Sequence, residues 1–252
     1  MSNKIALVTG GGRGLGKDMA LKLAQAGLDV VLTYVQNRSQ ADDVVRQIEG
    51  LGRRAVALQL DAGKSVTFPA FAAQLQGSLK KNWDTDKFDF LVNNAGIPGT
   101  APVTETTEEL FDALMNVHFK GVYFLTQTLL PLMRDKGGIV NLSSGLARFA
   151  IPGYSAYASM KGAIETYTRY LAKELGARGI RANTVAPGAI ATDFNKDALE
   201  NHPEMRGFIA AQTALGRIGE ADDIGGVVAF LCTDAARWVN AQRLEASGGM
   251  FL

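Results

Sequence analysis

The sequence has little cysteine, little histidine and almost no net charge. Its one cysteine, Cys232, excludes an internal disulfide framework and fits a reducing compartment, so we expect a cytoplasmic protein. The two histidines, His118 and His202, lie far apart in no metal-ligand pattern, and we expect no metal site. A formal net charge of +1 gives the chain no general attraction to nucleic acid or to an anionic membrane.

Long apolar runs are absent as well. None reaches the roughly 18 residues that a membrane-spanning helix needs. Residues 4–9 lead directly into a glycine-rich loop, so we expect no N-terminal signal. The 252 residues are 47% hydrophobic and 20% charged, which is ordinary for a soluble globular protein. Because neither a linker nor a repeat interrupts the chain, we expect a single domain over residues 1–252.

What the sequence does contain is a series of short apolar runs with helical patterns between them. The runs cover residues 5–8, 30–32, 56–58, 90–92, 139–140 and 182–185, with a weaker one at 243–245. Continuous apolar strands that alternate with helices predict a parallel sheet covered on both faces. With right-handed crossovers, this pattern predicts an α/β, doubly wound Rossmann fold of seven parallel strands. Ligands of such a fold bind at the carboxyl ends of the strands.

The first apolar run ends in a glycine-rich turn at residues 9–16, and a helical pattern follows directly. Glycines at such a turn let the backbone approach a pyrophosphate, while the helix N-terminus supplies N–H groups and the positive end of a dipole. A plain strand-to-helix turn is the alternative. Three spaced glycines between a strand and a helix favour a nucleotide site.

The second strand ends without an acidic residue. An acid there would hold the ribose 2′-hydroxyl of NAD, but the chain instead continues from Tyr34 to Arg38. Arg13 and Arg38 match the geometry of a 2′-phosphate, although two solvated surface arginines would look the same. The pattern favours NADP(H) and leaves NAD(H) open. Ser39 is expected to cap the helix that follows.

Polar residues follow the next strands. Asp61 is placed either to accept a hydrogen bond from the adenine amino group or to cap the following turn. Residues 93–96, Asn-Asn-Ala-Gly, either allow close approach of a cofactor or lock their turn through side-chain bonds to the backbone. Asn116 lies in an apolar helical stretch, where a buried amide needs partners. It either bends the helix or holds a water near the site, and we expect the neighbouring His118 to be structural.

Residues 137–162 carry the candidate chemistry. A strand there ends in Ser143 and Ser144, and Tyr157 lies one helical turn before Lys161. When a nicotinamide delivers hydride to a carbonyl carbon, the oxygen needs a proton, and Tyr157 is the candidate donor. A cation about 4 Å away is worth up to roughly 4 kcal/mol at an effective dielectric near 20. We therefore expect Lys161 to lower the pKa of the phenol by about three units, and Ser144 to bond the substrate oxygen.

Taken in order, these motifs resemble the short-chain dehydrogenase/reductase superfamily over essentially the whole chain. The matching patterns are Thr-Gly-x-x-x-Gly-x-Gly at 9–16, Asn-Asn-Ala-Gly at 93–96, Tyr-x-x-x-Lys at 157–161 and Pro-Gly-x-x-x-Thr at 187–192. The resemblance implies an NAD(P)-dependent carbonyl reductase or alcohol dehydrogenase with a catalytic tetrad of Asn116, Ser144, Tyr157 and Lys161. Ser144 rather than Ser143 matches because it stands thirteen residues before the tyrosine.

The same resemblance implies how the cofactor is held. Lys161 would also bind the nicotinamide ribose, Asn116 would hold a water in a proton relay, and Ile190 and Thr192 would meet the carboxamide. The expected cofactor-binding residues are Thr9, Gly10, Gly12, Arg13, Gly14, Leu15, Gly16, Tyr34, Arg38, Asp61, Ala62, Asn93, Ala95, Gly96, Tyr157, Lys161, Pro187, Gly188, Ile190 and Thr192.

The resemblance also implies an assembly, and the sequence departs from the family in places. Members are usually tetramers that pair the helices equivalent to those of Asn116 and Tyr157, so we expect a homotetramer. Residues 80–87 are read as a polar surface loop that is longer than common members have. Ala62 stands where a larger apolar residue is usual, which weakens the adenine assignment of Asp61.

Residues 193–216 interrupt the rhythm of strands and helices, which predicts a helical flap over the strand ends, with an ordinary surface excursion as the alternative. The expected pocket favours an apolar or mixed ketone or secondary alcohol, and Arg148 would receive an anion if it pointed inward. The expected pocket residues are Ile97, Ser144, Gly145, Leu146, Tyr154, Ile190, Phe194, Met205 and Phe208.

Two alternative functions stay open. A 3-oxoacyl-[acyl-carrier-protein] reductase would need a basic patch beside the pocket, for which Arg148, Arg206 and Arg217 are candidates. A non-catalytic nucleotide-sensing protein of the same fold usually lacks the tyrosine or the lysine, and both are present here.

Overall fold

The sheet is built outward from β1 (Ile5–Val8), whose four residues are all buried. Ala6 of β1 lies opposite Val30 of β2 on one side and Phe90 of β4 on the other. Further strands extend both edges in the order β3-β2-β1-β4-β5-β6-β7, and every pairing is parallel. The other strands are β2 (Asp29–Tyr34), β3 (Ala55–Gln59), β4 (Phe88–Asn93), β5 (Met133–Leu142), β6 (Arg181–Pro187) and β7 (Arg243–Ala246).

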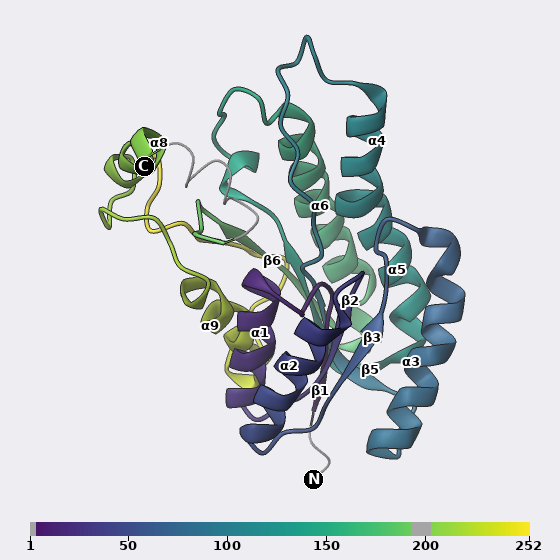
Figure 1. Cartoon of the computed structure of the whole chain (residues 1–252). Coiled ribbons are helices and arrows are strands. Elements are labelled where there is room, and N and C mark those ends of the chain that lie inside the picture. The colour runs from purple at the N-terminus through teal and green to yellow at the C-terminus, as the bar shows by residue number, and fades with distance from the viewer. Residues whose placement is uncertain (1–3, 193–202) are drawn as a thin grey trace.

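This computed structural model describes residues 4–192 and 203–252 (Figure 1). Each predicted apolar run lies inside one of the seven strands, so the doubly wound parallel sheet is confirmed. The direction in which the chain adds strands reverses between β1 and β4. The chain first adds β2 and β3 on one side of β1, and then crosses back to add β4 on the other side. The carboxyl ends of these two strands therefore bound the crevice in which such folds bind ligands.

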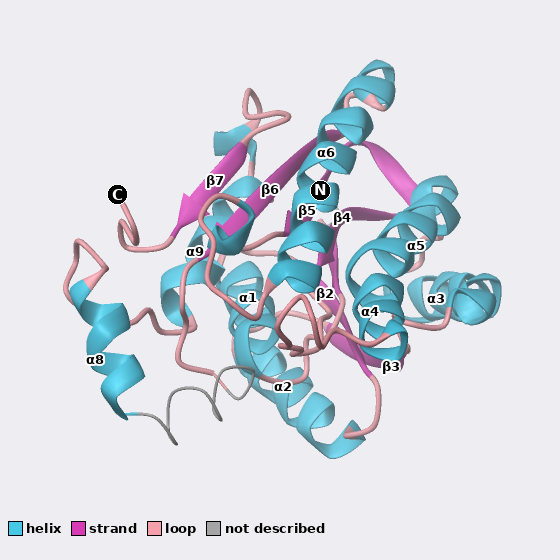
Figure 2. Cartoon of the chain, turned by 90° about the horizontal axis from the view of Figure 1, so that it is seen from above, coloured by secondary structure: helices cyan, strands magenta, loops and turns pink. Residues whose placement is uncertain are grey.

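Helices cover both faces of the sheet (Figure 2). One core cluster packs Met19, Ala41 and Val228 against one face, and a second packs Leu75, Leu125 and Leu171 against the other. The first face is covered by α1 (Gly14–Gln25), α2 (Arg38–Gly50) and α9 (Asp222–Leu231). The second is covered by α3 (Phe68–Trp83), α5 (Gly121–Leu129) and α6 (Ser155–Glu174).

Two further helices lie beside these layers. Helix α4 (Glu108–Met115) runs through a π-helical turn (Asn116–Lys120) into α5, so the three segments form one continuous rod. Helix α8 (Pro203–Ala211) lies near the C-terminus, away from the sheet (Figures 1 and 2). No helix within residues 4–192 and 203–252 is long and apolar enough to cross a membrane.

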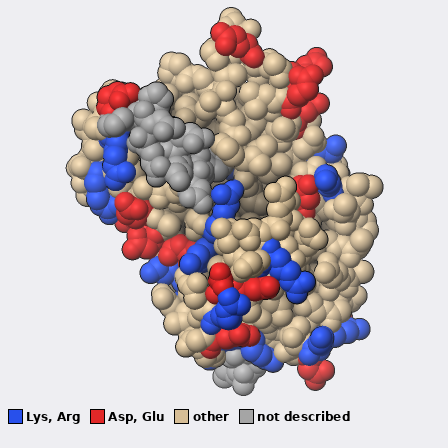
Figure 3. All heavy atoms as spheres, viewed as in Figure 1, with Lys and Arg blue, Asp and Glu red and all other residues tan. Residues whose placement is uncertain are grey.

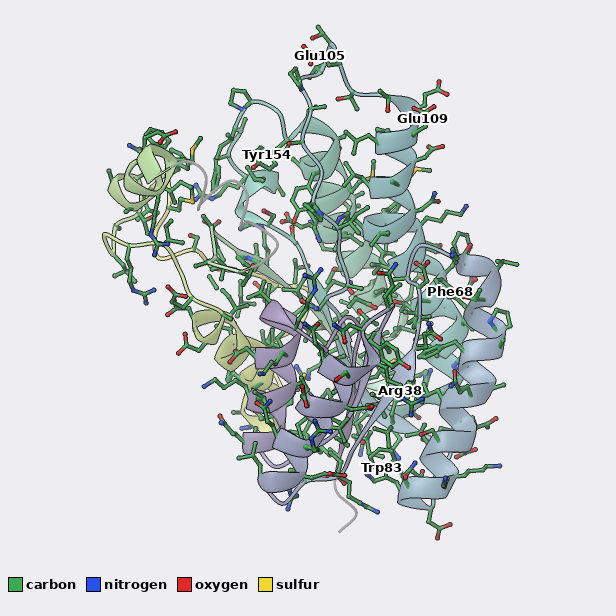
Figure 4. All side chains as sticks on the ribbon, viewed as in Figure 1. Arg38, Phe68, Trp83, Glu105, Glu109 and Tyr154 are labelled. Atoms are coloured by element: carbon green, nitrogen blue, oxygen red, sulfur yellow. The ribbon has the colours of Figure 1, made fainter. Side chains whose placement is uncertain are left out.

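Two local predictions were wrong. Helix α2 is capped by Asn37, whose side chain accepts a 3.1 Å hydrogen bond from the Gln40 amide, while Ser39 lies inside the first turn. Residues 80–83 belong to α3 and not to a loop. The Trp83 indole donates a 2.9 Å hydrogen bond to the buried Asp29 carboxylate, which anchors the last turn of α3. In Figure 4, Trp83 lies at the end of α3 far from Tyr154.

The predicted flap falls only partly within the described residues. Residues 193–202, and Phe194 with them, lie outside the part of the chain that the structure describes. The remainder forms α8 and a connection that pairs with the C-terminal tail. Thr213 makes an antiparallel bridge to Met250, and the Phe251 amide donates a 2.9 Å hydrogen bond to the Gln212 carbonyl.

Candidate active site

The turn between β1 and α1 admits glycine alone at its tightest point. A Cβ on Gly16 would lie 2.1 Å from the Gly10 carbonyl oxygen, and Gly10 and Gly14 have φ of 65° and 52°. Helix α1 then starts at Gly14 with no hydrogen bond from a capping side chain. The first N–H groups of a helix need partners from outside it, so this turn and helix end fit a pyrophosphate.

The glycine turn is tied to the turn after β4. The Thr9 hydroxyl oxygen accepts 3.0 Å hydrogen bonds from the Asn94 and Ala95 amides, and the Asn94 side chain donates a 2.9 Å bond to the Thr9 carbonyl. Asn94 therefore locks the turn, which is one of the two predicted readings. The Asn93 side chain instead donates into the core, to Thr126 and Asn141. Any contact of Asn93 with a cofactor is thus left to its backbone.

A shallow hollow of about 480 Å³ lies between the glycine turn and α2, and the predicted Arg13 lines it. Arg38 starts α2 (Figure 4) with a side chain 76% exposed and 3.4 Å from Asp42. Asp61 accepts a 3.0 Å hydrogen bond from the Gly63 amide and so does cap the following turn. The adenine contact of Asp61 stays a prediction. The other residues lining the hollow are Gly12, Gly14, Lys17, Gln40, Asp43, Val44, Arg46 and Gln47.

The loop after β6 reaches the same region. A Cβ built on Gly14 would lie 3.9 Å from the Thr192 Cβ, so the two loops face each other across a gap that a side chain would narrow. Ile190 is 3% exposed and pairs with Gly219 in an isolated parallel bridge, which fixes the loop. This arrangement fits a cofactor that runs from the glycine turn toward Ile190 and Thr192.

Ser144 and Tyr157 are hydrogen-bonded to each other through their side chains. Ser144 follows β5 and also accepts a 3.2 Å hydrogen bond from the Leu146 amide, so the 3₁₀ turn at Gly145–Ala147 holds it. Tyr157 lies in the first turn of α6. Lys161, one turn later, lies with its Nζ 5.4 Å from the centroid of the Tyr157 ring. The structure therefore brings these three predicted residues together.

Burial dominates the protonation of both ionisable groups. It raises the pKa of the Tyr157 phenol, an effect that the Ser144 hydrogen bond opposes, and it lowers the pKa of Lys161 to about 7. Lys161 is 5% exposed, and its Nζ donates a 2.8 Å hydrogen bond to the Leu142 carbonyl. The expectation that Lys161 lowers the pKa of Tyr157 is thus not met. Lys161 loses its own proton before the phenol titrates, so it carries no charge at that point.

Ser143, the neighbouring serine, belongs to a different hydrogen-bond network. Its hydroxyl donates a 2.7 Å hydrogen bond to Glu165 of α6, and Glu165 is held by Arg243 of β7 at 2.6 Å. Arg243 also donates a 3.3 Å bond to the Ser144 carbonyl. These bonds fasten the end of β5 to α6 and β7, and leave Ser144 as the serine beside Tyr157.

The π-helical turn places His118 against Tyr157. The two rings meet edge to face, with centroids 5.0 Å apart and an interplanar angle of 83°. His118 Nε2 also lies 2.9 Å from the Ile97 carbonyl oxygen and 3.2 Å from its amide nitrogen. The Asn116 side chain makes no hydrogen bond to any residue that the structure describes. The catalytic role of Asn116 stays a prediction, and no pattern in the sequence indicates the His118 contact.

Comparison with known proteins agrees with this geometry. Residues 10–251 match the family model described as enoyl-(acyl carrier protein) reductase. An uncharacterized oxidoreductase of Methylorubrum extorquens is 37% identical, over 99% of this chain and 98% of that protein. A tetrahydroxynaphthalene reductase of Pestalotiopsis fici is 34% identical, over 98% of this chain and 91% of that protein. The crystal structure of an angucycline C-6 ketoreductase with bound NADP superposes with a TM-score of 0.93 at 36% identity, covering 99% and 96% of the two chains.

The chain belongs to the short-chain dehydrogenase/reductase superfamily. It is an NAD(P)-dependent oxidoreductase of carbonyl and CH–OH groups.

Near the predicted substrate pocket of this short-chain dehydrogenase/reductase lie aromatic residues that the sequence did not point to. Phe149 follows the Ser144 turn, and its ring lies 4.8 Å from that of Phe251, next to the C-terminus. Phe251 in turn lies 6.4 Å from Phe208 of α8. Phe149 and Phe251 border a small apolar cluster of Ile209, Ile218 and Met250. The C-terminal tail therefore joins the predicted pocket residue Phe208 to the loop that follows Ser144.

Arg148 does not point inward to receive an anion. Its guanidinium donates two 2.7 Å hydrogen bonds to Glu245, and further bonds to the Met250 and Phe251 carbonyls at 2.8 and 3.2 Å. All of these acceptors belong to β7 and the tail behind it. The condition under which Arg148 would receive an anionic substrate is therefore not met, because Glu245 already neutralises its charge.

Proposed function

We propose that this short-chain dehydrogenase/reductase is an NADPH-dependent ketoreductase for apolar, ring-containing ketones. The observation that carries the proposal is the Ser144–Tyr157 hydrogen bond beside the buried Lys161, on the strand edge that also carries the glycine turn. A phenol donor, a hydroxyl that orients it and a nearby amine are what a carbonyl needs when it gains hydride and proton together.

Each side chain has a defined task in this reaction. The bound nicotinamide supplies the hydride. Tyr157 gives its proton to the carbonyl oxygen, and Ser144 donates a hydrogen bond to that oxygen while charge develops on it. Lys161, with a pKa of about 7, holds a proton below neutral pH and stabilises the phenolate that Tyr157 becomes. The turn at residues 9–16 and the loop ending at Thr192 would hold the cofactor.

The residues at the end of β2 support the preference for NADPH. No acidic side chain is present between Tyr34 and Arg38 to bond a ribose 2′-hydroxyl. Arg13 lines the hollow beside the glycine turn, where a 2′-phosphate would meet a guanidinium. The angucycline ketoreductase, similar over 99% of this chain, carries bound NADP.

The preference for ring-containing ketones is supported by the pocket wall and by the relatives. Phe149, Phe208 and Phe251 offer aromatic faces, and Phe208 is 52% exposed. Flat substrates stack on such faces at low cost. Two similar proteins, the tetrahydroxynaphthalene reductase and the angucycline ketoreductase, are named for polycyclic aromatic substrates.

A reductase that docks an acyl-carrier protein finds less support. Two of its three candidate arginines are paired, Arg148 with Glu245 and Arg217 with Asp223 at 2.6 Å. On the face shown in Figure 3, basic and acidic side chains are intermingled and form no single basic patch. An acidic carrier domain would need an unpaired basic surface beside the pocket.

The deciding experiment compares Tyr157→Phe with Tyr170→Phe on a panel of ketones, sugars, steroids and acyl thioesters, with NADPH and with NADH. Tyr170 lies on the same helix but is 62% exposed, so its variant controls for the loss of a phenol oxygen. We expect NADPH-dependent reduction of cyclic and aromatic ketones. Tyr157→Phe should lose nearly all turnover and keep cofactor affinity, while Tyr170→Phe keeps both. Substantial turnover in Tyr157→Phe would reject Tyr157 as the acid, and exclusive use of acyl thioesters would reject the substrate class.

We also propose the homotetramer that the family resemblance implies. Aromatic side chains support it, since Phe111 of α4 and Tyr123 and Phe124 of α5 are each about two-fifths exposed. Exposed aromatic patches on a soluble protein mark interaction surfaces. Light scattering of the purified protein should give the mass of four chains, and a monomeric mass would reject the assembly.

A further inference from the structure

His118 is the one buried histidine among the described residues, and it has an unusual set of contacts. It is 1% exposed, although it stands at the third position of the π-helical turn. Its ring touches Tyr157 on one side, and its Nε2 meets both backbone polar groups of Ile97. A single imidazole therefore links the proposed proton donor to the residue that follows the turn after β4.

The backbone at Gly96 leaves the space that the His118 imidazole fills. A Cβ on Gly96 would lie 2.8 Å from His118 Cε1 and 3.4 Å from Nδ1, so any other residue at position 96 displaces the imidazole. Likewise, a Cβ on Gly121 would lie 2.0 Å from the Ala62 carbonyl oxygen. The rod therefore approaches the strand ends closely at the point where the π-helical turn ends. The position of His118 therefore requires glycine at position 96, and the close approach of the rod requires glycine at position 121.

His118 also carries a cost to stability. Its Nδ1 is buried and has no hydrogen-bond partner among the residues that the structure describes. A buried polar atom left without a partner costs about 1–3 kcal/mol. A leucine at this position would avoid that cost and still fill the core. Burial, with the charge of Lys161 acting in the same direction, lowers the pKa of His118 to about 3, against a hydrogen bond to the Ile97 carbonyl that raises it. The imidazole is thus neutral at working pH and does not act as an acid.

We propose that His118 is a positioning residue that fixes the Tyr157 ring and the Ile97 backbone in one geometry for proton transfer. The inference rests on the proposed function, since Tyr157 is the donor there. Of its two contacts, the decisive one is the hydrogen bond that Nε2–H donates to the Ile97 carbonyl oxygen and that holds the loop there, while the edge-to-face packing fills the space beside the phenol. The shorter contact, to the carbonyl oxygen, is the one in which Nε2–H donates.

Two substitutions separate this role from simple packing. His118→Asn keeps a donor and an acceptor for Ile97 on a shorter side chain, and His118→Phe keeps a ring against Tyr157 but cannot bond to Ile97. We expect His118→Asn to stay within severalfold of the wild-type kcat. We expect His118→Phe to lose roughly 100-fold in kcat, with an unchanged KM for NADPH, because a misplacement of about 1 Å costs on that order.

Gly96→Ala supplies a second test that leaves His118 in place. The new methyl group should push the imidazole and lower kcat in the wild-type background. In the His118→Asn background the displaced ring atom is absent, so Gly96→Ala should cost far less. Equal effects of Gly96→Ala in both backgrounds would show that position 96 acts without His118 and would overturn the link.

A measurement that does not depend on turnover tests the role of His118 separately from the proposed function. The phenol of Tyr157 is titrated by near-ultraviolet absorbance in each His118 variant, and the signal is isolated by subtracting the same variant with Tyr157→Phe. We expect the titration to move in His118→Phe and to stay close to wild type in His118→Asn. A wild-type titration and kcat in His118→Phe, or equal losses in both variants that follow their thermal stability, would overturn the proposal. If wild type reduces no ketone of the panel, the proposed function fails, and the titration still decides the role of His118.

Discussion

Arg148 and Glu245, 97 positions apart in the sequence, are joined by two hydrogen bonds of 2.7 Å. The same guanidinium reaches the carbonyls of Met250 and Phe251, so it fastens the C-terminal tail to the loop that carries Ser144. The Nε, Nη1 and Nη2 atoms all donate, a fork of donors that an ammonium group does not offer. The position of the Phe251 ring in the proposed pocket therefore depends on Arg148.

Arg148→Lys keeps the positive charge but should weaken the hydrogen bonds that hold Phe251 and the C-terminal tail in place. We expect KM for bulky cyclic ketones to rise on the order of tenfold, because Phe251 is no longer held in place. The dissociation constant of NADPH should not change, since the clamp lies on the substrate side. Steady-state kinetics with one small and one polycyclic ketone measures this, and Arg169→Lys on the exposed side of α6 is the control. Equal KM changes for both ketones would contradict the assignment.

The buried Lys161 predicts a specific pH dependence of stability. Its pKa is about 7 in the folded protein against an ordinary value of 10.5. Between these values the unfolded chain binds a proton that the folded protein does not, so the free energy of unfolding rises with pH through this window. Lys161→Met removes the effect. The stability of wild type relative to Lys161→Met should therefore increase from pH 7 to 10.5, by at most about 1.4 kcal/mol per pH unit.

Urea unfolding of the two proteins at matched pH measures the difference. Shifts in every other group cancel when the variants are compared. A relative stability that falls with rising pH would mean that Lys161 is protonated more firmly in the folded state than in the unfolded chain. That result would reject the lowered pKa of the buried Lys161.

Gly121 and Gly77 should respond in opposite directions to replacement by alanine. A Cβ at Gly121 would lie 2.0 Å from the Ala62 carbonyl and 2.6 Å from that of Asn116, both backbone atoms that a side-chain rotation cannot move. We expect a loss of about 1–3 kcal/mol or more in the free energy of unfolding. Gly77 lies in α3 with open space around its Cβ position, so alanine there should gain about 0.5–1 kcal/mol. Denaturant unfolding checks both, and a neutral Gly121→Ala would show that the π-helical turn tolerates displacement.

Local patterns were sufficient to predict the sheet and half of the site. The apolar runs identify the strands because a buried parallel strand must be apolar on both faces. The glycine spacing at residues 9–16 identifies the turn because backbone approach at Gly16 excludes any side chain. Ser144 was distinguished from Ser143 by its match to the family's serine, which precedes the tyrosine by thirteen residues, and the structure places Ser144 beside Tyr157.

The features that sequence reasoning missed depend on contacts between distant segments. Trp83 extends α3 because its indole reaches Asp29, 54 positions away. His118 meets Tyr157 because a π-helical turn rotates the helix, and no periodicity in the sequence marks that turn. The pKa of Lys161 was misjudged because a charge at helical spacing was counted without its desolvation. Burial of that kind is a property of the packed core and not of spacing.

Arg13 provides the sharpest test of the cofactor preference. It lines the hollow beside the glycine turn, and its guanidinium is the predicted partner of a 2′-phosphate, a group that NADH lacks. Arg13→Ala should raise the dissociation constant of NADPH roughly 10- to 100-fold, the range expected for a lost hydrogen bond to a charged group, and leave that of NADH within about twofold. Fluorescence titration of each cofactor at fixed ionic strength measures both constants. Arg169→Ala on α6 serves as the matched control, because it removes the same charge far from the hollow. A parallel loss for NADPH and NADH would assign Arg13 to the pyrophosphate or to the turn itself. Tighter binding of NADH than of NADPH by the unaltered protein would reject the preference for NADPH altogether.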